Sequence, residues 1–244
     1  MSLDLIVFLA ATFLAALVAG VAGFAFGLVA AAAWLHVLTP LQTTTLIVAF
    51  GLIVQGYSVW KLRRALKFER LLPFLIGGAL GLPVGVTLLR WVAPAHMKMA
   101  VGVLLMLFSL YSPARPQLAK VTAGGRLADG GVGVLSGILG GTTGFGGILP
   151  TIWCTLRGCP KNEQRSIFQP TGVAIFLGTT LLLGASGSVT ADTLRLFVIG
   201  LPALLAGSWL GLRLYGKLGE ATFRKIVLAL LISGLALVVP LGVG

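Results

Sequence analysis

The sequence predicts an all-α integral membrane protein with two inverted repeats, each a broken-helix hairpin followed by three transmembrane helices. Three observations predict this class. Hydrophobic residues make up 57% of the 244-residue chain and charged residues only 10%, whereas a soluble domain has about 25% charged residues. The mean hydropathy is +1.04. Glycine-rich interruptions also recur inside two long uncharged segments, at 20–27 and 140–150.

The elements follow from the spacing of the charges, because a helix needs about 20 apolar residues to cross a bilayer. The segment 5–38, interrupted by "GVAGFAFG", predicts a hairpin. Three crossings are expected after it, at 42–60, 71–89 and 97–113. A second hairpin is expected at 130–157 and three further crossings at 166–186, 194–212 and 224–240.

The second hairpin is predicted from length. Its uncharged part, 130–156, would be about 40 Å long as a helix at 1.5 Å per residue. This is long for one pass and too short for two, so the chain is expected to reach about mid-membrane and return. The stretch "GGTTGFGGILP" at 140–150 lies where the tip would be. A conventional bundle of eight crossings is the alternative.

Basic residues predict the orientation, since Lys and Arg mark the cytoplasmic side. The cluster at 61–70 has the most of them and is placed inside. Successive loops alternate between the two sides of the membrane. Counting forward from this cluster, and backward from a C-terminal end without Lys or Arg, places both 114–128 and 157–165 inside. Arg90 and Lys98 fall outside in this scheme. We expect a multi-pass protein of the cytoplasmic (inner) membrane with its C-terminus outside.

The two halves align with each other. "GVAGFAFGL" (20–28) matches "GTTGFGGIL" (141–149), with Gly20 on Gly141, and in the third helices Gly81 and Gly85 fall on Gly207 and Gly211. An odd number of crossings per half turns the second half upside down, an arrangement common in secondary transporters. The predicted repeats are 1–113 and 129–244, joined by a cytoplasmic linker at 114–128.

Residues 140–171 resemble the second-half signature of the TauE/SafE family, also called the 4-toluene sulfonate uptake permease (TSUP) family. The shared features are a glycine-rich turn, a proline, a Gly-x-Pro-Lys turn and an Arg-Ser pair. In this chain they are Gly144, Gly146 and Gly147; Pro150; Gly158, Pro160 and Lys161; and Arg165 with Ser166. The resemblance implies a secondary transporter that moves a small sulfur-containing anion, sulfite or an organosulfonate such as sulfoacetate, by alternating access.

The breaks are the candidate binding sites. A broken helix exposes backbone groups that lipid cannot satisfy, so it must be buried in protein or line a cavity. A helix N-terminus at such a break suits an oxyanion, and glycines let the anion approach the backbone. Packing of helices through small residues is the alternative. The candidate substrate-binding residues are Gly20, Gly23 and Phe24 in the first break, Gly141, Thr142, Thr143, Gly144, Phe145, Gly146 and Gly147 in the second, and Gln55, Arg165 and Gln169 in the crossings.

The two glutamines could offer amide donors inside the membrane, or contact a neighbouring helix. Gln169 lies four residues after Arg165, so both share one helix face. An interfacial charge is the alternative for Arg165.

Composition also limits the other classes. The net charge of +12 resides in short loops, which predicts contact with membrane lipids and not with nucleic acid. Asp and Glu lie at the ends of the expected crossings, and a sodium site could use carbonyls and hydroxyls, so H⁺ or Na⁺ remains open as coupling ion. No cofactor or metal is expected. An enzyme with Cys154 or Cys159 as nucleophile, an anion channel and a non-transporting scaffold are the alternative functions, and the protein could be a monomer or a homodimer.

Overall fold

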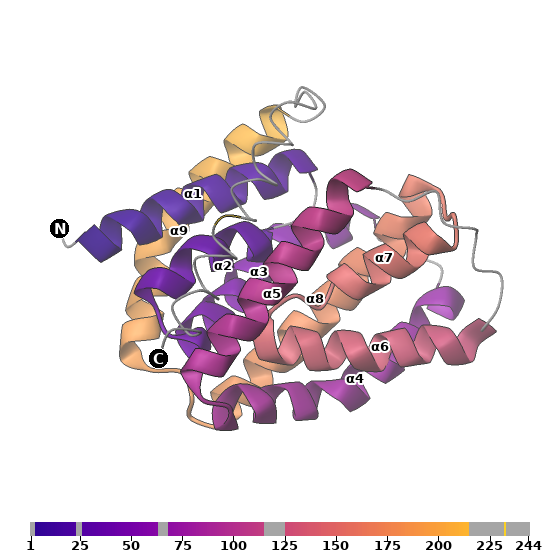
Figure 1. The fold of residues 1–244 in the computed structure, drawn as a ribbon. Helices are drawn as coiled ribbons and strands as arrows, with labels where there is room; N and C mark the ends of the chain where they lie inside the picture. Colours follow the sequence, from indigo (N-terminus) through magenta and orange to yellow (C-terminus); the bar gives the residue numbers. More distant parts are fainter. Residues whose placement is uncertain (1–2, 23–25, 63–67, 115–124, 215–231, 233–244) are drawn as a thin grey trace. The chain divides into compact units, whose positions relative to one another are not determined.

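The computed structural model describes residues 3–22, 26–62, 68–114, 125–214 and 232. These residues form helices joined by short turns (Figure 1). The helices are α1 (Leu3–Ala22), α2 (Phe26–Val37), α3 (Pro40–Leu62), α4 (Phe68–Trp91), α5 (Pro94–Ala114), α6 (Gly125–Thr143), α7 (Ile148–Leu156), α8 (Lys161–Ala185) and α9 (Ala191–Arg213). The prediction of an all-helical chain is therefore confirmed for the described residues, while the expected crossing at 224–240 lies outside them.

Most boundaries agree with the sequence prediction to within a few residues. The expected helix break is present, because α6 ends at Thr143 and α7 begins at Ile148, while a re-entrant hairpin at this place stays a prediction. The main differences are α6, which begins at Gly125 instead of 130, and α8, which begins at Lys161 instead of 166. Charged residues do not end a helix, and Glu163 in the first turn of α8 interacts favourably with the helix dipole. Arg165 therefore lies within the helix and not in the loop before it.

The chain divides into two compact units, each built from both sequence halves. One unit contains Met1–Thr43, Val92–Pro116 and Ala191–Gly244, and so includes α1, α2, α5 and α9. The other contains Thr44–Trp91 and Gln117–Thr190, and so includes most of α3 together with α4, α6, α7 and α8. The units of packing thus differ from the predicted repeats 1–113 and 129–244, and the repeat itself stays a prediction.

In the second unit, glycines bring α4 and α6 into backbone contact along their length (Figure 1). Gly81 and Gly85 of α4 face the carbonyl oxygens of Val134 and Ile138 so closely that a side chain at either glycine would overlap them. Gly141 of α6 faces α4 in return, and a Cβ there would lie 2.9 Å from the backbone nitrogen of Val86. Close approach through small residues is how helices pack where lipid removes the hydrophobic drive.

In the first unit, α9 and α1 pack in the same way. Gly207 and Gly211 of α9 face the carbonyl oxygens of Phe13 and Leu17, and a Cβ on Gly20 would lie 3.0 Å from the backbone of Gly211. In the alignment of Gly20 with Gly141, Phe13 falls on Val134 and Leu17 on Ile138. The two sets of contacts therefore correspond pair by pair.

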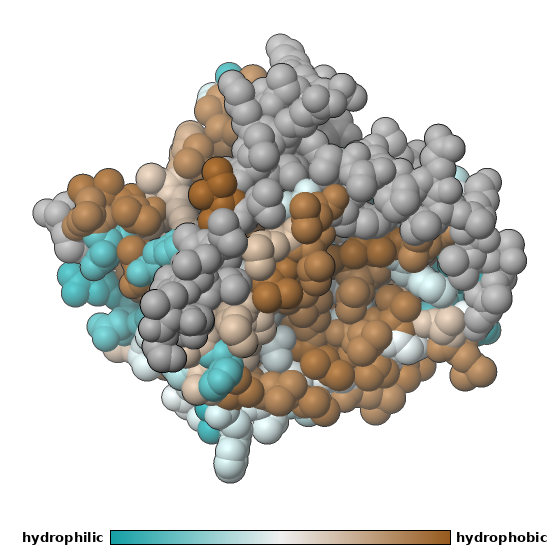
Figure 2. Space-filling view, viewed as in Figure 1, coloured by the Kyte–Doolittle hydropathy of each residue, from teal (hydrophilic) through white to brown (hydrophobic). Residues whose placement is uncertain are grey.

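The outer surfaces of the helices are apolar. Figure 2 shows hydrophobic residues over α4 and α6, and α4 carries an exposed stripe of large side chains four residues apart, opposite its glycines. The stripe consists of Leu72, Ile76, Leu80, Val84 and Leu88. Within the described residues, four helices are long and apolar enough to cross a membrane, beginning at Leu3, Phe68, Glu163 and Ala191. Large residues outside and glycines inside are typical of helices surrounded by lipid.

Candidate functional site

The turn between α6 and α7 lies inside the second unit. Residues 141–146 are buried, and Gly144 has φ +78°, a left-handed conformation that glycine adopts at little cost. Gly147 is the N-cap of α7, and no side chain of the described residues caps it. The N-terminus of α7, with its partial positive charge, is thus held within the protein.

Helix α3 packs against one side of this turn. The Thr44 hydroxyl donates a 3.0 Å hydrogen bond to the carbonyl oxygen of Thr142. One turn further along α3, the side chain of Ile47 occupies the space where a Cβ on Gly144 would project, 2.5 Å from its Cγ2. The conformation of the turn is therefore fixed both by φ and by this contact.

Helix α8 packs against the other side. Ile175 contacts Gly146, and the carbonyl of Phe168 lies 3.8 Å from the position that a Cβ on Gly147 would take. One turn after Phe168, a Cβ on Gly172 would lie 4.0 Å from the Cα of Gly147 and 2.9 Å from Oε1 of Gln55. Residues from α3, α7 and α8 therefore meet at Gly147.

Gln55 is the polar side chain at this meeting point. Its Oε1 atom is buried and has no hydrogen-bond partner among the described residues. A buried carbonyl oxygen without a donor is costly. Oε1 is an acceptor, so Gln55 could bind an anion only with its amide turned to present the Nε2 donor instead. Gln169 is also buried, with 3% exposure, and it lies on α8 between Phe168 and Gly172. The structure thus brings Gln55, Gln169 and Gly147 to one region.

The two predicted threonine donors already have acceptors in this structure. The Thr142 hydroxyl donates to the carbonyls of Ile138 and Leu139 in its own helix. The Thr143 hydroxyl donates to the Leu139 carbonyl at 2.7 Å and accepts a hydrogen bond from the Phe145 N–H at 3.3 Å. A hydroxyl has a single proton, so either threonine must rotate before it can donate to a ligand.

The remaining candidates lie elsewhere. Arg165 is partly buried one turn before Gln169, and Phe145 is buried in the turn. Gly20 and Gly141 form the backbone contacts of α1 with α9 and of α6 with α4. Gly23 and Phe24 lie outside the described residues. Gly20 belongs to the other unit, so it is described apart from the residues around Gly147.

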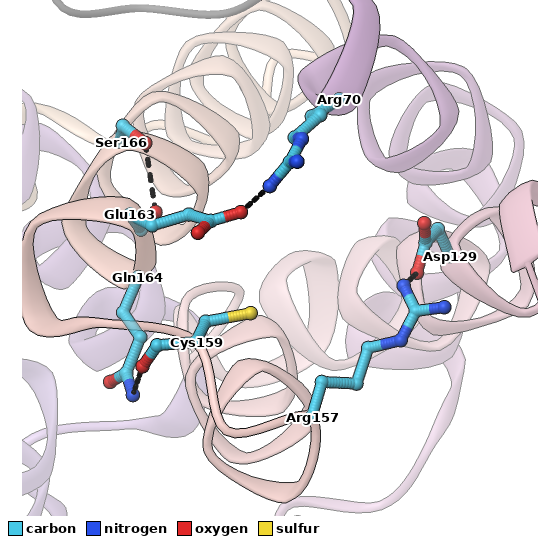
Figure 3. Close-up of polar contacts among 7 residues, drawn as sticks. All are labelled: Arg70, Asp129, Arg157, Cys159, Glu163, Gln164 and Ser166. Carbon is cyan, nitrogen blue, oxygen red and sulfur yellow. Dashed lines mark hydrogen bonds and ion pairs between the residues drawn. The ribbon is translucent and has the colours of Figure 1, made fainter. Parts of the chain in front are cut away.

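An ionic cluster connects the start of α6 with the end of α7 (Figure 3). Asp129, near the start of α6, accepts hydrogen bonds of 2.8 Å at Oδ1 from the indole N–H of Trp153 and from Nη1 of Arg157. Arg157, directly after α7, also lies over the Trp153 ring, 5.4 Å from its centroid. The start of α6 and the end of α7 therefore lie at the same end of the unit.

A cavity of about 410 Å³ opens beside this cluster. A second ion pair, Arg70 with Glu163, joins the first turns of α4 and α8 at its edge (Figure 3). Its apolar wall contains Phe74, Cys154 and Ile167, which pack together and are buried. This cavity was not predicted from the sequence. The signal was the presence of opposite charges near the ends of α4, α6, α7 and α8, but spacing along the chain does not show which charges pair.

A protein-family model described as "Sulfite exporter TauE/SafE" matches residues 8–238, almost the whole chain. No curated protein matches, and no solved structure matches.

Proposed function

The chain belongs to the sulfite exporter TauE/SafE family, and from this membership we propose that it carries a sulfur-containing oxyanion by alternating access between two sides of the cytoplasmic membrane. The family is one of membrane transporters and not of enzymes, and the apolar helices agree with a multi-pass membrane protein. The substrate that we propose is sulfite or a small organosulfonate such as sulfoacetate.

The observation that carries the proposal is the partly buried N-terminus of α7 at Gly147, which lies near Gln55 and next to Phe168, the chain neighbour of the buried Gln169. An oxyanion held in hydrocarbon needs donors, and a full Lys or Arg charge at mid-membrane costs at least about 2.5–3.5 kcal/mol to insert. Backbone N–H groups at a helix start, together with side-chain amides, provide donors without that charge. Charge-assisted hydrogen bonds contribute about 1.5–3 kcal/mol each.

The ionic cluster supports a hairpin that enters the membrane and returns. Because Asp129 pairs with Arg157, the chain enters α6 and leaves α7 at one end of the unit. Arg70 pairs with Glu163 beside the same cavity, so residues flanking the three loops predicted to be cytoplasmic gather together. On this basis we assign that end to the cytoplasm, with the turn at 144–147 about halfway across.

The matched glycine contacts support the inverted repeat. When the halves are aligned, the residues that join α4 to α6 fall on the residues that join α9 to α1. In each case the second crossing of one half packs against the first hairpin helix of the other. Two related halves in opposite orientations are the usual basis of alternating access, with the substrate near the bilayer midplane.

The positions of the acidic residues support coupling without a buried carboxylate. Asp4, Glu69, Glu163 and Asp192 lie in the first turns of their helices, and Asp129 lies near the start of α6. Proton-coupled carriers commonly keep an ionisable group inside the membrane. A proton carried by the substrate itself, or Na⁺ bound by carbonyl and hydroxyl oxygens, fits this distribution better.

The direct test is uptake of radiolabelled sulfite and sulfoacetate into proteoliposomes that contain the purified protein. A carrier should give saturable uptake and should accelerate exchange when unlabelled substrate is present inside. Flux that rises linearly with concentration and shows no exchange would identify an anion channel. No flux of either anion, with the protein folded, would support a scaffold and refute the proposal.

A further inference from the structure

The cavity beside Asp129 and Arg157 is separate from the site at Gly147 and has a different set of lining residues. We propose that it is a docking site for the transported anion on the cytoplasmic side. The guanidinium groups of Arg70 and Arg157 bind the anion there in place of their carboxylate partners, Glu163 and Asp129. This inference rests on the proposed function, and its ligand class is the same small sulfonate or sulfite.

The volume and lining fit a small oxyanion. About 410 Å³ lies within the usual size range of ligand sites. Arg70 and Arg157 both line the cavity, and each contacts its carboxylate through Nη1. A guanidinium has several further N–H donors arranged as a fork, so each arginine can hold a second oxyanion without losing all contact with the first. Bidentate binding of planar or tetrahedral oxyanions is the preferred use of arginine.

The four charges of the cavity cancel, so the field of the surrounding segments decides which ligand is attracted. The described segments that supply its charged residues, 68–70, 125–129 and 157–165, contain five Lys and Arg against three Asp and Glu. A cleft within such a field raises the local concentration of anions. An inorganic cation would meet the same field as a barrier, which is why we assign the cavity to an anion.

The exposure of the two ion pairs suggests the order of contact. The Arg70 side chain is 58% exposed and its partner Glu163 is 27% exposed, whereas Arg157 is 26% and Asp129 13% exposed. An exposed ion pair contributes little to stability. An incoming anion can therefore displace Glu163 from Arg70 with little loss of free energy. Asp129 accepts hydrogen bonds from both Arg157 and Trp153. We therefore expect the anion to displace Asp129 from Arg157 only after it has displaced Glu163 from Arg70.

The buried residues of the cavity wall separate this site from the one at the turn. Ile167 lines the cavity, and the next residue, Phe168, contacts Gly147. An anion docked between the arginines therefore reaches the N-terminus of α7 only after Phe74, Cys154 and Ile167 move.

The chain carries its own reporter for this test. It has only two cysteines; Cys154 is buried and Cys159 lines the cavity partly exposed, with its sulfur directed towards the space between the ion pairs (Figure 3). A Cys154→Ala variant leaves Cys159 as the single thiol. In detergent, its thiolate attacks the sulfenyl sulfur of a methanethiosulfonate reagent, forms a disulfide and releases methanesulfinate.

The rates with an anionic reagent, methanethiosulfonate ethylsulfonate, and with its cationic trimethylammonium analogue are compared with those of a free thiol. We expect the ratio of anionic to cationic rate to exceed that of the free thiol by about threefold or more, the effect of one nearby charge in a watery site. Arg70→Gln should abolish this preference, Arg70→Lys should retain it and Glu163→Gln should increase it. Sulfoacetate should slow the anionic reagent in the parent and not in Arg70→Gln.

Two results would overturn the docking site. One is the same ratio of anionic to cationic rate in the parent, Arg70→Gln and Glu163→Gln. The other is equal slowing of the anionic reagent by sulfoacetate in the parent and in Arg70→Gln. If the protein transports sulfoacetate but shows either result, only the docking site fails. If sulfoacetate and sulfate protect Cys159 in an arginine-dependent way but no sulfur anion is transported, the docking site stands and the proposed function fails.

Discussion

Gly147→Ala separates binding from packing more cleanly than any other change in the turn. Gly147 has φ −85° and ψ −11°, a conformation that alanine adopts without strain. The nearest atom to its new Cβ would be the Phe168 carbonyl oxygen at 3.8 Å, an ordinary contact. Replacing glycine at a compatible position stabilises a protein by about 0.4–1 kcal/mol through the unfolded state, so the variant should fold at least as well as the parent.

The same methyl group would lie at the N-terminus of α7, where we place the anion. If it displaces one charge-assisted hydrogen bond, the loss is about 1.5–3 kcal/mol. At about 1.4 kcal/mol per decade, the dissociation constant should rise about ten- to a hundredfold. A gain in stability with a loss in affinity is the expected signature.

Gly144→Ala is the matched control. At φ +78° an L-residue costs about 1–2 kcal/mol, and Ile47, 2.5 Å from the added carbon, must move as well. This variant should therefore lose stability. For the same reason Gly144→Leu, which the sequence alone suggests as a block to binding, would report on packing.

The assay is calorimetry with sulfite and sulfoacetate on detergent-purified protein, with the unfolding temperature measured on the same samples. Parent affinity in a folded Gly147→Ala variant would refute binding at the start of α7. An equal drop in stability for Gly147→Ala and Gly144→Ala would show that the turn is tighter than the geometry indicates.

Four further predictions concern topology, the ionic cluster, the polar residues and the driving force. Single cysteines introduced into 114–128 and 157–165 should be labelled from the same, cytoplasmic side; labelling from opposite sides would exclude the hairpin. Asp129→Asn and Arg157→Gln should each lower the unfolding temperature, and because the pair is mostly buried their double-mutant cycle should give a coupling of about 1–2 kcal/mol; independent effects would mean that the pair does not hold α6 to α7. Gln169→Leu and Thr143→Val should weaken anion binding while the protein elutes as a single species, and parent affinity in both would place the anion elsewhere. Substituting each of the six acidic residues in turn by Asn or Gln should leave substantial flux in proteoliposomes, and one folded variant without uptake would point to a carboxylate proton relay.

The order of helices could be predicted because charges are so rare in this chain. A membrane helix must be long and uncharged, so the gaps between charges locate helices such as α4 and α9 within a few residues. The break at 144–147 was visible for the same reason, since a run of glycines in apolar sequence has few other uses.

The partners of the helices could not be predicted. Gly81 and Gly207 predict that their helices pack closely against another helix, but a glycine does not identify which helix this is. Likewise, Thr142 and Thr143 were expected to donate to a ligand, yet both donate to carbonyls of their own helix. A threonine in a helix always has such a carbonyl within reach, and only the conformation shows which acceptor it takes.

The glycine contact of α1 with α9 has a consequence for the order of assembly. Helices enter the membrane in the order of synthesis, so α1 is inserted when Phe13 and Leu17 have no partner. Gly207 and Gly211, whose backbone they contact, are translated almost two hundred residues later. Helix α1 therefore completes its packing only after α9 has been made, and until then its small-residue face has no α9 backbone to contact.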